Sequence, residues 1–366
     1  MTPPILGFRD LQIRAGSRTL LDIPSFHLDA GERVSLVGPN GSGKTTFLHA
    51  AALLRPPDTG HVAIAGEVVN HHNAANLRRR VSIVFQDPLL FSVDVLPNAA
   101  AGLRFHGVPR AKAERRAAEF LDVFGVGHLA HRKPPGLSGG EAARVALARA
   151  FATDPDLLLL DESFSALDTS SRAALIPELR ERLAERGAAA ILVTHDITEA
   201  LDFASRLAVL DDGRVIAAGD IRTLILRPPF RRVATLLGVE NVIAGRIVTC
   251  ATGFGNVEIA PGLHLHAACD QNWRPGSAVE VTVPPTMVRL VAASEPVPEE
   301  WNAILAQVES IAHQPGWDLV TLDAAGATLR VRETWQPGGI PWSAGDTLTA
   351  TFPPEAAWII PDAGSG

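Results

Sequence analysis

The sequence predicts an α/β domain with a mostly parallel sheet, followed by a smaller all-β domain. Up to about residue 235, apolar strand-like runs alternate with Ala- and Leu-rich helical stretches, the pattern of parallel strands connected by helices. Beyond it, short strands and Gly/Pro turns prevail, and all six tryptophans lie in this last third. At 366 residues the chain is longer than one core usually organises. We therefore expect domains at residues 1–235 and 236–366.

A glycine-rich turn follows the strand-like run RVSLV. The stretch GPNGSGKTT, residues 38–46, has the P-loop spacing of a glycine, four residues, then Gly-Lys-Thr. Backbone N–H groups of such a loop surround phosphate, the lysine reaches the β- and γ-phosphates, and the threonine hydroxyl is placed to coordinate Mg²⁺. We expect the nucleotide to be bound by Gly38, Asn40, Gly41, Ser42, Gly43, Lys44, Thr45 and Thr46.

Two further polar sites follow along the chain. The run VSIVFQ ends in Gln86, whose amide at the end of a buried strand can reach Mg²⁺ and an attacking water. The segment LSGGE, residues 137–141, opens the helical run EAARVALARAF. Ser138 and the N–H groups of Gly139 and Gly140 therefore form a second helix start suited to an anion. A plain N-cap is the alternative, which the P-loop upstream disfavours.

The run LLLLDES suits a strand that is buried on both faces and ends in Asp161 and Glu162. Asp161 would hold Mg²⁺, through water or Thr45, and Glu162 would polarise the water that attacks the γ-phosphate. The segment SALD follows at residues 165–168, and ILVTHD ends a further strand at His195, which can contact the γ-phosphate.

Charge and composition exclude several classes of protein. The net charge is −7, and the longest basic run is RRR at residues 78–80, so we expect no nucleic-acid partner. No apolar run is long enough to cross a bilayer, and the amino terminus lacks the pattern of a secretion signal, which predicts a cytoplasmic protein. The two cysteines, Cys250 and Cys269, lack metal-site spacing, and we expect reduced thiols.

The last third of the chain shows an internal repeat. ENVIAGRIV at 240–248 is similar to WNAILAQVE at 301–309, and a Pro-Pro pair follows at equivalent places, 284–285 and 353–354. Each copy, about 240–290 and 300–360, predicts a few alternating strands that close on the Pro-Pro turn, as in a five-stranded barrel of OB-fold type. Shared β composition without duplication is the alternative.

The P-loop, Gln86, LSGGE, Asp161-Glu162, SALD and His195, in this order, resemble the motif set of the ATP-binding cassette (ABC) family over about residues 5–235. The resemblance implies a P-loop NTPase fold and ATP hydrolysis. It implies Mg²⁺ held by Thr45, Gln86 and Asp161, and Glu162, His195 and Gln86 as catalytic residues.

The resemblance also implies partners. ABC ATPases form a head-to-tail homodimer, in which Ser138, Gly139 and Gly140 would serve the ATP held by the other subunit. Closing and reopening of this dimer would drive integral-membrane permease subunits, docked around residues 86–91, at the cytoplasmic face of the membrane.

Three positions depart from the family pattern. Members usually carry an aromatic residue, which stacks on adenine, where this chain has Ala15 before Gly16, and the chain contains no tyrosine. Arg14 or Arg18 is the candidate substitute. Glu141 stands where glutamine is commoner in the LSGGE motif, and Ala143 where a glutamine is common.

The tail resembles the TOBE-type carboxy-terminal domains of importer ATPases, which work with solute-binding proteins. VFQDPLLF and GVENVIAGRIV most resemble subunits that import tungstate or molybdate. Such repeats can bind the transported oxyanion, but Glu299 and Glu300 would repel an anion here, and holding the dimer together is their alternative role. Sulfate, ferric ion, polyamine and sugar remain alternative cargoes.

The sequence disfavours two other classes of function. A non-transport ABC ATPase acting on DNA or ribosomes would usually contain a coiled-coil insertion or a second cassette, and the acidic balance disfavours nucleic acid. A switch that binds ATP without hydrolysis is disfavoured by Glu162 and His195.

Overall fold

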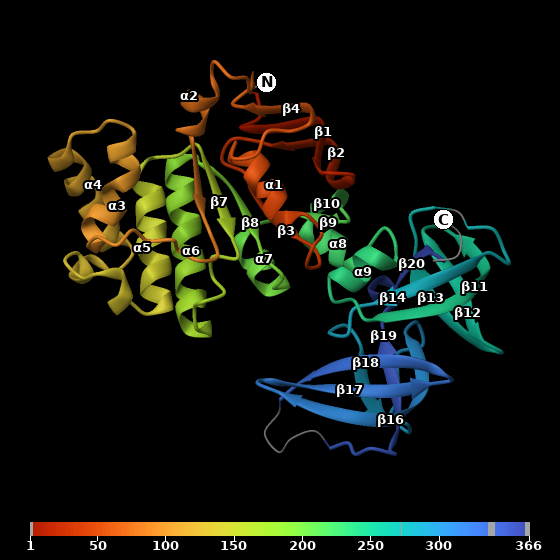
Figure 1. The fold of residues 1–366 in the computed structure, drawn as a ribbon. Helices are drawn as coiled ribbons and strands as arrows, with labels where there is room; N and C mark the ends of the chain where they lie inside the picture. Colours follow the sequence, from red (N-terminus) through yellow and green to blue (C-terminus); the bar gives the residue numbers. More distant parts are fainter. Residues whose placement is uncertain (1–2, 272, 336–340, 363–366) are drawn as a thin grey trace. The chain divides into compact units, whose positions relative to one another are not determined.

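The computed structural model describes residues 3–271, 273–335 and 341–362, and divides the chain into two compact units, Met1–Gly219 and Asp220–Gly366 (Figure 1). The first unit has two hydrophobic cores, and the second unit has a core of its own. The boundary expected at residue 235 falls inside helix α9 (Arg231–Leu236) of the second unit. Within the described ranges, no helix is both long and apolar enough to span a membrane.

The first unit contains two sheets. The smaller is antiparallel, with strand order β2-β1-β4-β5, and the larger has the order β10-β9-β3-β8-β7-β6. In the larger sheet β9, β3, β8, β7 and β6 pair in parallel. The strands are β1 (Leu6–Ala15), β2 (Arg18–Leu28), β3 (Arg33–Val37), β4 (Thr59–Ile64), β5 (Glu67–Val68), β6 (Val81–Val84), β7 (Leu157–Asp161), β8 (Ala189–Val193), β9 (Arg206–Asp211) and β10 (Arg214–Asp220).

Helices and the small sheet cover the two faces of the large sheet (Figure 1). Helices α3 to α6 pack on one face, and α1 with the small antiparallel sheet packs on the other. The helices of this unit are α1 (Lys44–Ala51), α2 (Ala74–Arg78), α3 (Val95–Phe105), α4 (Arg110–Val123), α5 (Gly139–Ala152), α6 (Thr169–Arg186) and α7 (Ile197–Phe203).

The leucines of strand β7 show why the large sheet is covered on both faces. Its leucines are fully buried, and they alternate between two cores. Leu158 and Leu160 pack with helices α3 to α6, whereas Leu157 and Leu159 pack with α1 and the small sheet. Because successive side chains of a strand point to opposite faces, a run of leucines suits only a strand covered on both sides.

The second unit is mainly β. The described residues form a closed barrel of order β11-β12-β13-β20-β14 and a five-stranded sheet of order β15-β19-β16-β17-β18. Its elements are α8 (Ile221–Leu226), α9, β11 (Asn241–Ala251), β12 (Phe254–Ala260), β13 (Leu263–Ala268), β14 (Ala278–Val283), β15 (Arg289–Ala292), β16 (Asn302–Gln314), β17 (Trp317–Ala324), β18 (Ala327–Thr334), β19 (Thr347–Phe352) and β20 (Trp358–Pro361).

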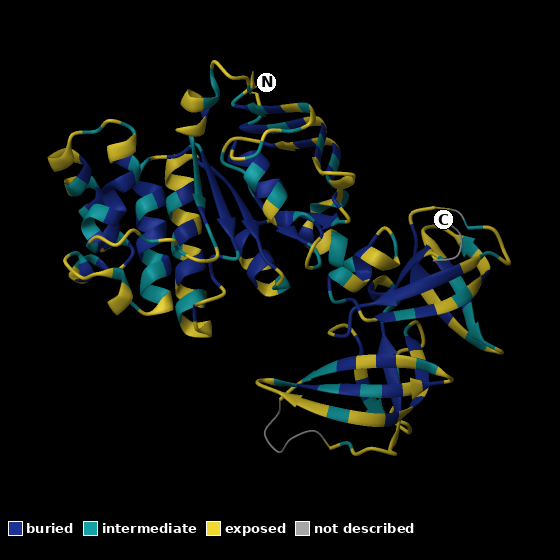
Figure 2. Ribbon diagram, in the orientation of Figure 1, coloured by how far each residue is buried: buried dark blue, intermediate teal, exposed yellow. Residues whose placement is uncertain are grey.

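One core serves both halves of this unit. Buried residues of the barrel and of the five-stranded sheet form a single cluster. Along β16 and β17, more and less buried residues alternate, the pattern of a sheet with one covered face (Figure 2). The expected fold class is thus confirmed: an α/β P-loop unit with an OB-like all-β region at the carboxyl end.

The two halves exchange their last strands, which the sequence did not predict. We expected each copy to close on its own Pro-Pro turn. Instead β20, after the second Pro-Pro pair, completes the barrel of the first copy, and β15, after the first pair, pairs with β19 of the second copy. Proline cannot donate to a ladder, so both pairs end a strand and lead the chain out of its own sheet.

Equivalent asparagines join the halves reciprocally. Asn241, which begins β11, exchanges two hydrogen bonds with the backbone of Arg330 on β18, at 2.7 and 2.8 Å. Asn302, which begins β16, does the same with His266 on β13, at 2.7 and 2.9 Å. Both asparagines are buried. The aligned positions of the two copies therefore make the same contact, each with the other copy.

Candidate nucleotide-binding site

The predicted phosphate loop joins β3 to α1 at the carboxyl end of β3. Gly43, the N-cap of α1, has φ 105°, a conformation that favours glycine. At Gly38 a Cβ atom would lie 2.1 Å from the carbonyl oxygen of Leu210 on β9. Glycine is therefore required at both ends of the loop, for conformation at one end and for space at the other.

The loop lines a cavity of about 450 Å³. Lys44 is only 7% exposed, and its Nζ donates to the carbonyl oxygens of Gly38 at 2.9 Å and Pro39 at 3.0 Å. Burial lowers the pKa of Lys44, while the carboxylates of Glu162 and Asp161 raise it and so favour its charged form. The predicted residues that line the cavity are Asn40, Gly41, Gly43, Lys44, Thr45, Thr46, Gln86 and Glu162.

Two acids stand at the carboxyl end of β7, Asp161 as its last residue and Glu162 directly after it, where Glu162 lines this cavity. Asp161 is 8% exposed, and burial, then the neighbouring Glu162, raises its pKa. A cation bound beside Asp161 would restore its charged form. Glu162 has φ 43°, which is costly for a residue other than glycine, and its N–H donates to the carbonyl of Val193 at 3.0 Å. The catalytic candidate thus stands on a strained turn.

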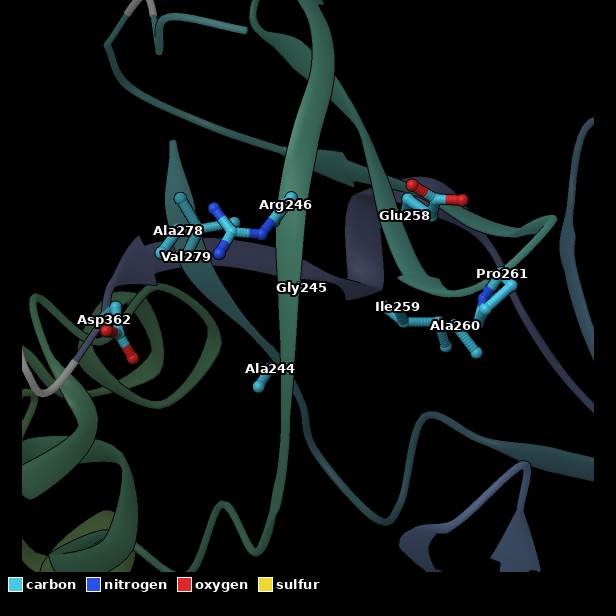
Figure 3. Close-up of a pocket in the computed structure, with 10 residues that line it drawn as sticks. All are labelled: Ala244, Gly245, Arg246, Glu258, Ile259, Ala260, Pro261, Ala278, Val279 and Asp362. Carbon is cyan, nitrogen blue, oxygen red and sulfur yellow. The ribbon is translucent and has the colours of Figure 1, made fainter. Parts of the chain in front are cut away.

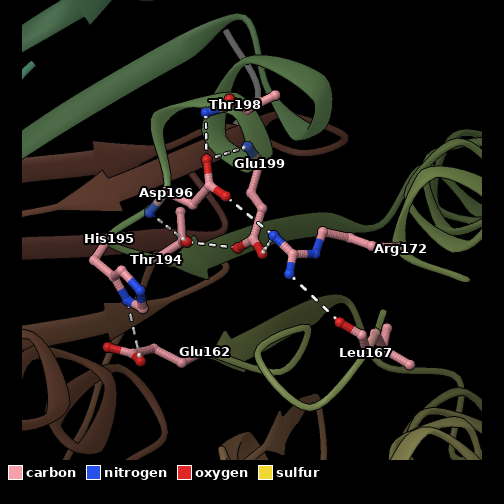
Figure 4. A network of polar contacts seen from close by, with 8 residues as sticks. All are labelled: Glu162, Leu167, Arg172, Thr194, His195, Asp196, Thr198 and Glu199. Carbon is pink, nitrogen blue, oxygen red and sulfur yellow. Dashed lines mark hydrogen bonds and ion pairs between the residues drawn. The ribbon is translucent and has the colours of Figure 1, made fainter. Parts of the chain in front are cut away.

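His195 meets Glu162 across the ends of neighbouring strands (Figure 4). Its Nδ1 lies 3.3 Å from Glu162 Oε2, although the two residues are 33 positions apart in the chain and follow different strands. The imidazole is 67% exposed. The structure therefore brings these two predicted residues together and leaves the histidine accessible to a ligand.

A charged network lies beside His195, and sequence reasoning missed it (Figure 4). Arg172 Nη1 lies 2.8 Å from Glu199 Oε1 and 3.0 Å from Asp196 Oδ2. Glu199 is 5% exposed, and it also accepts a 2.6 Å hydrogen bond from Thr194 Oγ1. Burial raises the pKa of Glu199, while Thr194 and Arg172 lower it. The network therefore fixes the residues on both sides of His195.

Arg172 extends this network to the SALD segment. Its Nη2 donates to the carbonyl oxygen of Leu167 at 3.4 Å (Figure 4). The next residue, Asp168, caps α6 by accepting from the N–H of Ser171 at 2.9 Å, and hydroxyl donation from Ser170 and Ser171 holds the pKa of Asp168 far below its usual range. One arginine thus connects the segments that carry SALD and His195.

The LSGGE segment lies outside the cavity described above. Ser138 and Glu141 form a capping box at the start of α5: Ser138 Oγ accepts from Glu141 N at 3.3 Å, and Glu141 Oε2 accepts from Ser138 N at 2.7 Å. Cβ atoms at Gly139 and Gly140 would lie 3.3 and 3.1 Å from side chains of the SALD segment. The structure therefore places LSGGE beside SALD and not beside the P-loop of its own chain.

Two segments outside the predicted motifs form the rest of the cavity lining. Arg18, Thr19 and Leu20 at the start of β2 and the Asp212-Gly213 turn between β9 and β10 complete the lining. Arg18 is one of the two arginines considered for the missing aromatic residue. The other, Arg14, does not line the cavity, and its Nη2 donates to Gln12 Oε1 at 3.1 Å.

A second cavity of about 450 Å³ lies on the barrel of the second unit (Figure 3). Its charged lining residues are Arg246, Glu258 and Asp362. Two carboxylates beside one guanidinium do not suit an oxyanion. This cavity therefore gives no support to anion binding by the repeats.

The P-loop cavity fits a magnesium nucleotide. Ser42 Oγ is buried and, among the described residues, has no hydrogen-bond partner. Lys44 shares its ammonium between two loop carbonyls, and Asp161 is a buried carboxyl with a raised pKa. A phosphate would give Ser42 Oγ a partner and the Lys44 ammonium an anion, and a cation would favour the charged form of Asp161.

Comparisons with known proteins show the family to which this chain is similar. Residues 21–165 match the family model of the ABC transporter. The chain is 36% identical to an Fe(3+) ions import ATP-binding protein of Streptomyces avermitilis, over 94% of this chain and 97% of the relative. It is 36% identical to a spermidine/putrescine import ATP-binding protein of Rubrobacter xylanophilus, over 85% and 81%, and 35% identical to a molybdenum import ATP-binding protein of Mycobacterium tuberculosis, over 90% and 88%.

A solved structure extends the agreement to the fold. A dimeric ATP-binding cassette bound to ADP and Pi superposes with a TM-score of 0.54 and 30% identity, over 59% of this chain and 99% of that one. The chain therefore belongs to the ABC transporter family, as an ATP-binding protein of the import type. It is an ATPase that uses MgATP.

Proposed function

We propose that this chain is the ATP-hydrolysing subunit of a membrane importer, bound at the cytoplasmic face of its permease subunits. The observation that carries the proposal is that Glu162 lines the P-loop cavity and lies 3.3 Å from His195. Relatives that match most of the chain are named import ATP-binding proteins. The arrangement is that of a site built to position a phosphoryl group and a water.

Each site residue has a role in this proposal. The backbone of residues 38–46 holds the phosphates, and Lys44 moves its ammonium from the loop carbonyls to the β- and γ-phosphates. Thr45, Gln86 and Asp161 would hold Mg²⁺, which neutralises charge on the phosphate oxygens when bound. Glu162 orients the water, and His195 contacts the γ-phosphate.

We further propose that the site is completed by a second copy of the chain. Ser138, Gly139 and Gly140 lie outside the cavity of their own chain. Gly139 and Gly140 begin α5, and N–H groups in the first turn of a helix have no partner within that helix. The related cassette bound to ADP and Pi is dimeric. In the head-to-tail dimer the LSGGE segment of one subunit would cover the ATP of the other.

The permease contact of the proposal lies on the segment after β6. Leu89 and Phe91 are 64% and 47% exposed there. Asn98, fully buried on α3, holds the segment by donating to the carbonyls of Phe91 and Val93 at 2.9 Å and accepting from Phe91 N at 2.8 Å. A fixed backbone that presents apolar side chains suits a docking surface, and the same segment begins at Gln86 of the ATP site.

Hydrolysis and binding variants test the ATPase role. Glu162→Gln should lower ATP hydrolysis by about 10²–10⁴-fold while nucleotide binding is kept, because the amide cannot accept the proton of the water. Lys44→Ala should abolish nucleotide binding. Glu181→Gln, which makes the same change at an exposed position of α6, is the matched control. An unchanged hydrolysis rate in Glu162→Gln would remove this residue from its role.

We propose a molybdate- or tungstate-type oxyanion as the cargo. Support comes from the resemblance of VFQDPLLF and GVENVIAGRIV to such importers and from the molybdenum relative. Ferric ion is the second candidate, because the ferric relative is matched over nearly its whole length. Elemental mass spectrometry of cells lacking this protein, grown on limiting molybdate, tungstate or iron, separates the two. Loss of iron alone would refute the oxyanion.

A further inference from the structure

The fold brings the only two cysteines of the chain into contact. Cys250 lies near the end of β11, and Cys269 directly follows β13. Their sulfur atoms are 3.2 Å apart. From the sequence we expected reduced thiols, because the two cysteines lack metal-site spacing. The structure forms a dithiol pair in the barrel of the second unit.

Backbone hydrogen bonds hold both cysteines in place. Cys250 lies opposite Gly255 in the ladder between β11 and β12, and the N–H of Cys269 donates to the carbonyl of Gly253 at 2.9 Å. A disulfide bond is about 2.05 Å long, so the sulfurs need to approach by about 1.1 Å. Because the backbone is held on both sides, we expect this approach to come from rotation of the two side chains about χ1.

The two thiols differ in exposure. Cys269 is 8% exposed, and burial, with the contact to Cys250, raises the pKa of its thiol to about 11. Cys250 is half-buried. Because a thiolate must be both formed and reached by the oxidant, Cys250 is the thiol that reacts first and Cys269 the one that resolves.

We propose that Cys250 and Cys269 are an oxidation site, which forms a reversible intramolecular disulfide by exchange with a low-molecular-weight disulfide of the glutathione type. The thiolate of Cys250 attacks one sulfur of this disulfide, which gives a mixed disulfide and releases one thiolate. Cys269 then loses its proton and attacks the Cys250 sulfur, which releases the second thiol. Two electrons pass from the protein dithiol to the small disulfide, and two small thiols are formed.

The bond would tie the first and third strands of the barrel together. It closes a loop that contains the whole of β12, and cross-links of this kind stabilise chiefly by restricting the unfolded chain. We expect the oxidised second unit to unfold at a temperature higher by on the order of 5–10 °C. Tryptophan fluorescence reports this unit alone, since every tryptophan lies at or beyond residue 273.

The test uses the full-length protein in glutathione buffers of rising oxidised fraction. After the protein is unfolded in denaturant and alkylated, mass spectrometry should find both thiols blocked in the reduced protein. In the oxidised protein it should find neither blocked, with the mass lower by two hydrogen atoms and peptides joined through Cys250 and Cys269. The bond should revert on return to reducing buffer.

Single variants separate the two roles. Cys269→Ser should stop at a mixed disulfide on Cys250, whereas Cys250→Ser should leave Cys269 reduced, because that thiol is buried. Neither variant should gain the rise in unfolding temperature. Three outcomes would each overturn the proposal: two thiols that are still alkylated on unfolding after fully oxidising buffer, a mixed disulfide on each cysteine, or a bond between two chains.

Discussion

The ion pair between Arg172 and Glu199 offers the sharpest test of the structure. Replacing Arg172 by methionine keeps much of the side-chain volume but leaves the carboxylate of Glu199, whose side chain is 6% exposed, without its cation. Breaking a buried pair from one side costs about 3 kcal/mol. In a unit that spans Met1–Gly219 this lowers the unfolding temperature by about 6–12 °C.

Circular dichroism in the far ultraviolet follows this loss. Most of the helices, and none of the tryptophans, belong to the first unit, so its unfolding is seen by circular dichroism while tryptophan fluorescence follows the second unit. Glu199→Gln combined with Arg172→Met should recover at least about 1 kcal/mol of the sum of the single losses, because no charge is then stranded. Additive losses within about 0.5 kcal/mol would refute the pair.

The same variant should respond to pH. The native pKa of Glu199 is raised by burial and held down in part by Arg172, so it rises further in Arg172→Met. A carboxyl whose pKa is raised in the folded protein destabilises the fold when it is ionised. This cost is complete above the raised pKa and absent below the pKa of the unfolded chain, about 4.3. The difference in free energy of unfolding between wild type and Arg172→Met should therefore be largest near pH 8 and decrease toward pH 5. A constant difference would mean that lost packing, not charge, is the cause.

Two further variants test the loops of the site. Gly38→Ala places a Cβ 2.1 Å from a backbone carbonyl oxygen, so we expect the free energy of unfolding to fall by about 1–3 kcal/mol and nucleotide binding to weaken. Denaturant unfolding and nucleotide titration measure the two effects. Gly7→Ala, whose Cβ meets only Ala63 Cβ at 3.8 Å, is the control, and equal losses in the two variants would contradict the prediction. Asn98→Ala leaves the carbonyls of Phe91 and Val93 without the donor that Asn98 supplies. Backbone amides in the segment after β6 should therefore exchange hydrogen faster, while the exchange rates in β7 do not change. Equal exchange rates in wild type and variant would show that Asn98 does not hold the segment.

Much of the fold follows from local patterns. The P-loop glycines, the leucines of β7 and the strands that precede Gln86 and His195 are each encoded within a few residues, so periodicity and spacing predict them. The separation of LSGGE from the P-loop was expected only from the family resemblance. The structure agrees with it.

What the sequence could not predict depends on contacts between distant residues. Arg172 and Glu199 lie on different helices, and neither stands in a motif. The turn at Asp212-Gly213 joins the cavity only because β9 lies beside β3. The left-handed conformation of Glu162 has no signal, since residue type there argues against it. The exchange of β15 and β20 is hidden because both copies have the same pattern of strands.

That exchange bears on how the tail could change during evolution. A deletion from residue 294 onward would remove β20 as well as the second copy, and β13 and β14 would become free edges that invite aggregation. Deleting the first copy would likewise strip β15 from β19. A duplicated module is ordinarily free to be lost again one copy at a time. Here the loss of one copy leaves the other without a strand, so a lineage either loses both copies together or first replaces the missing strand.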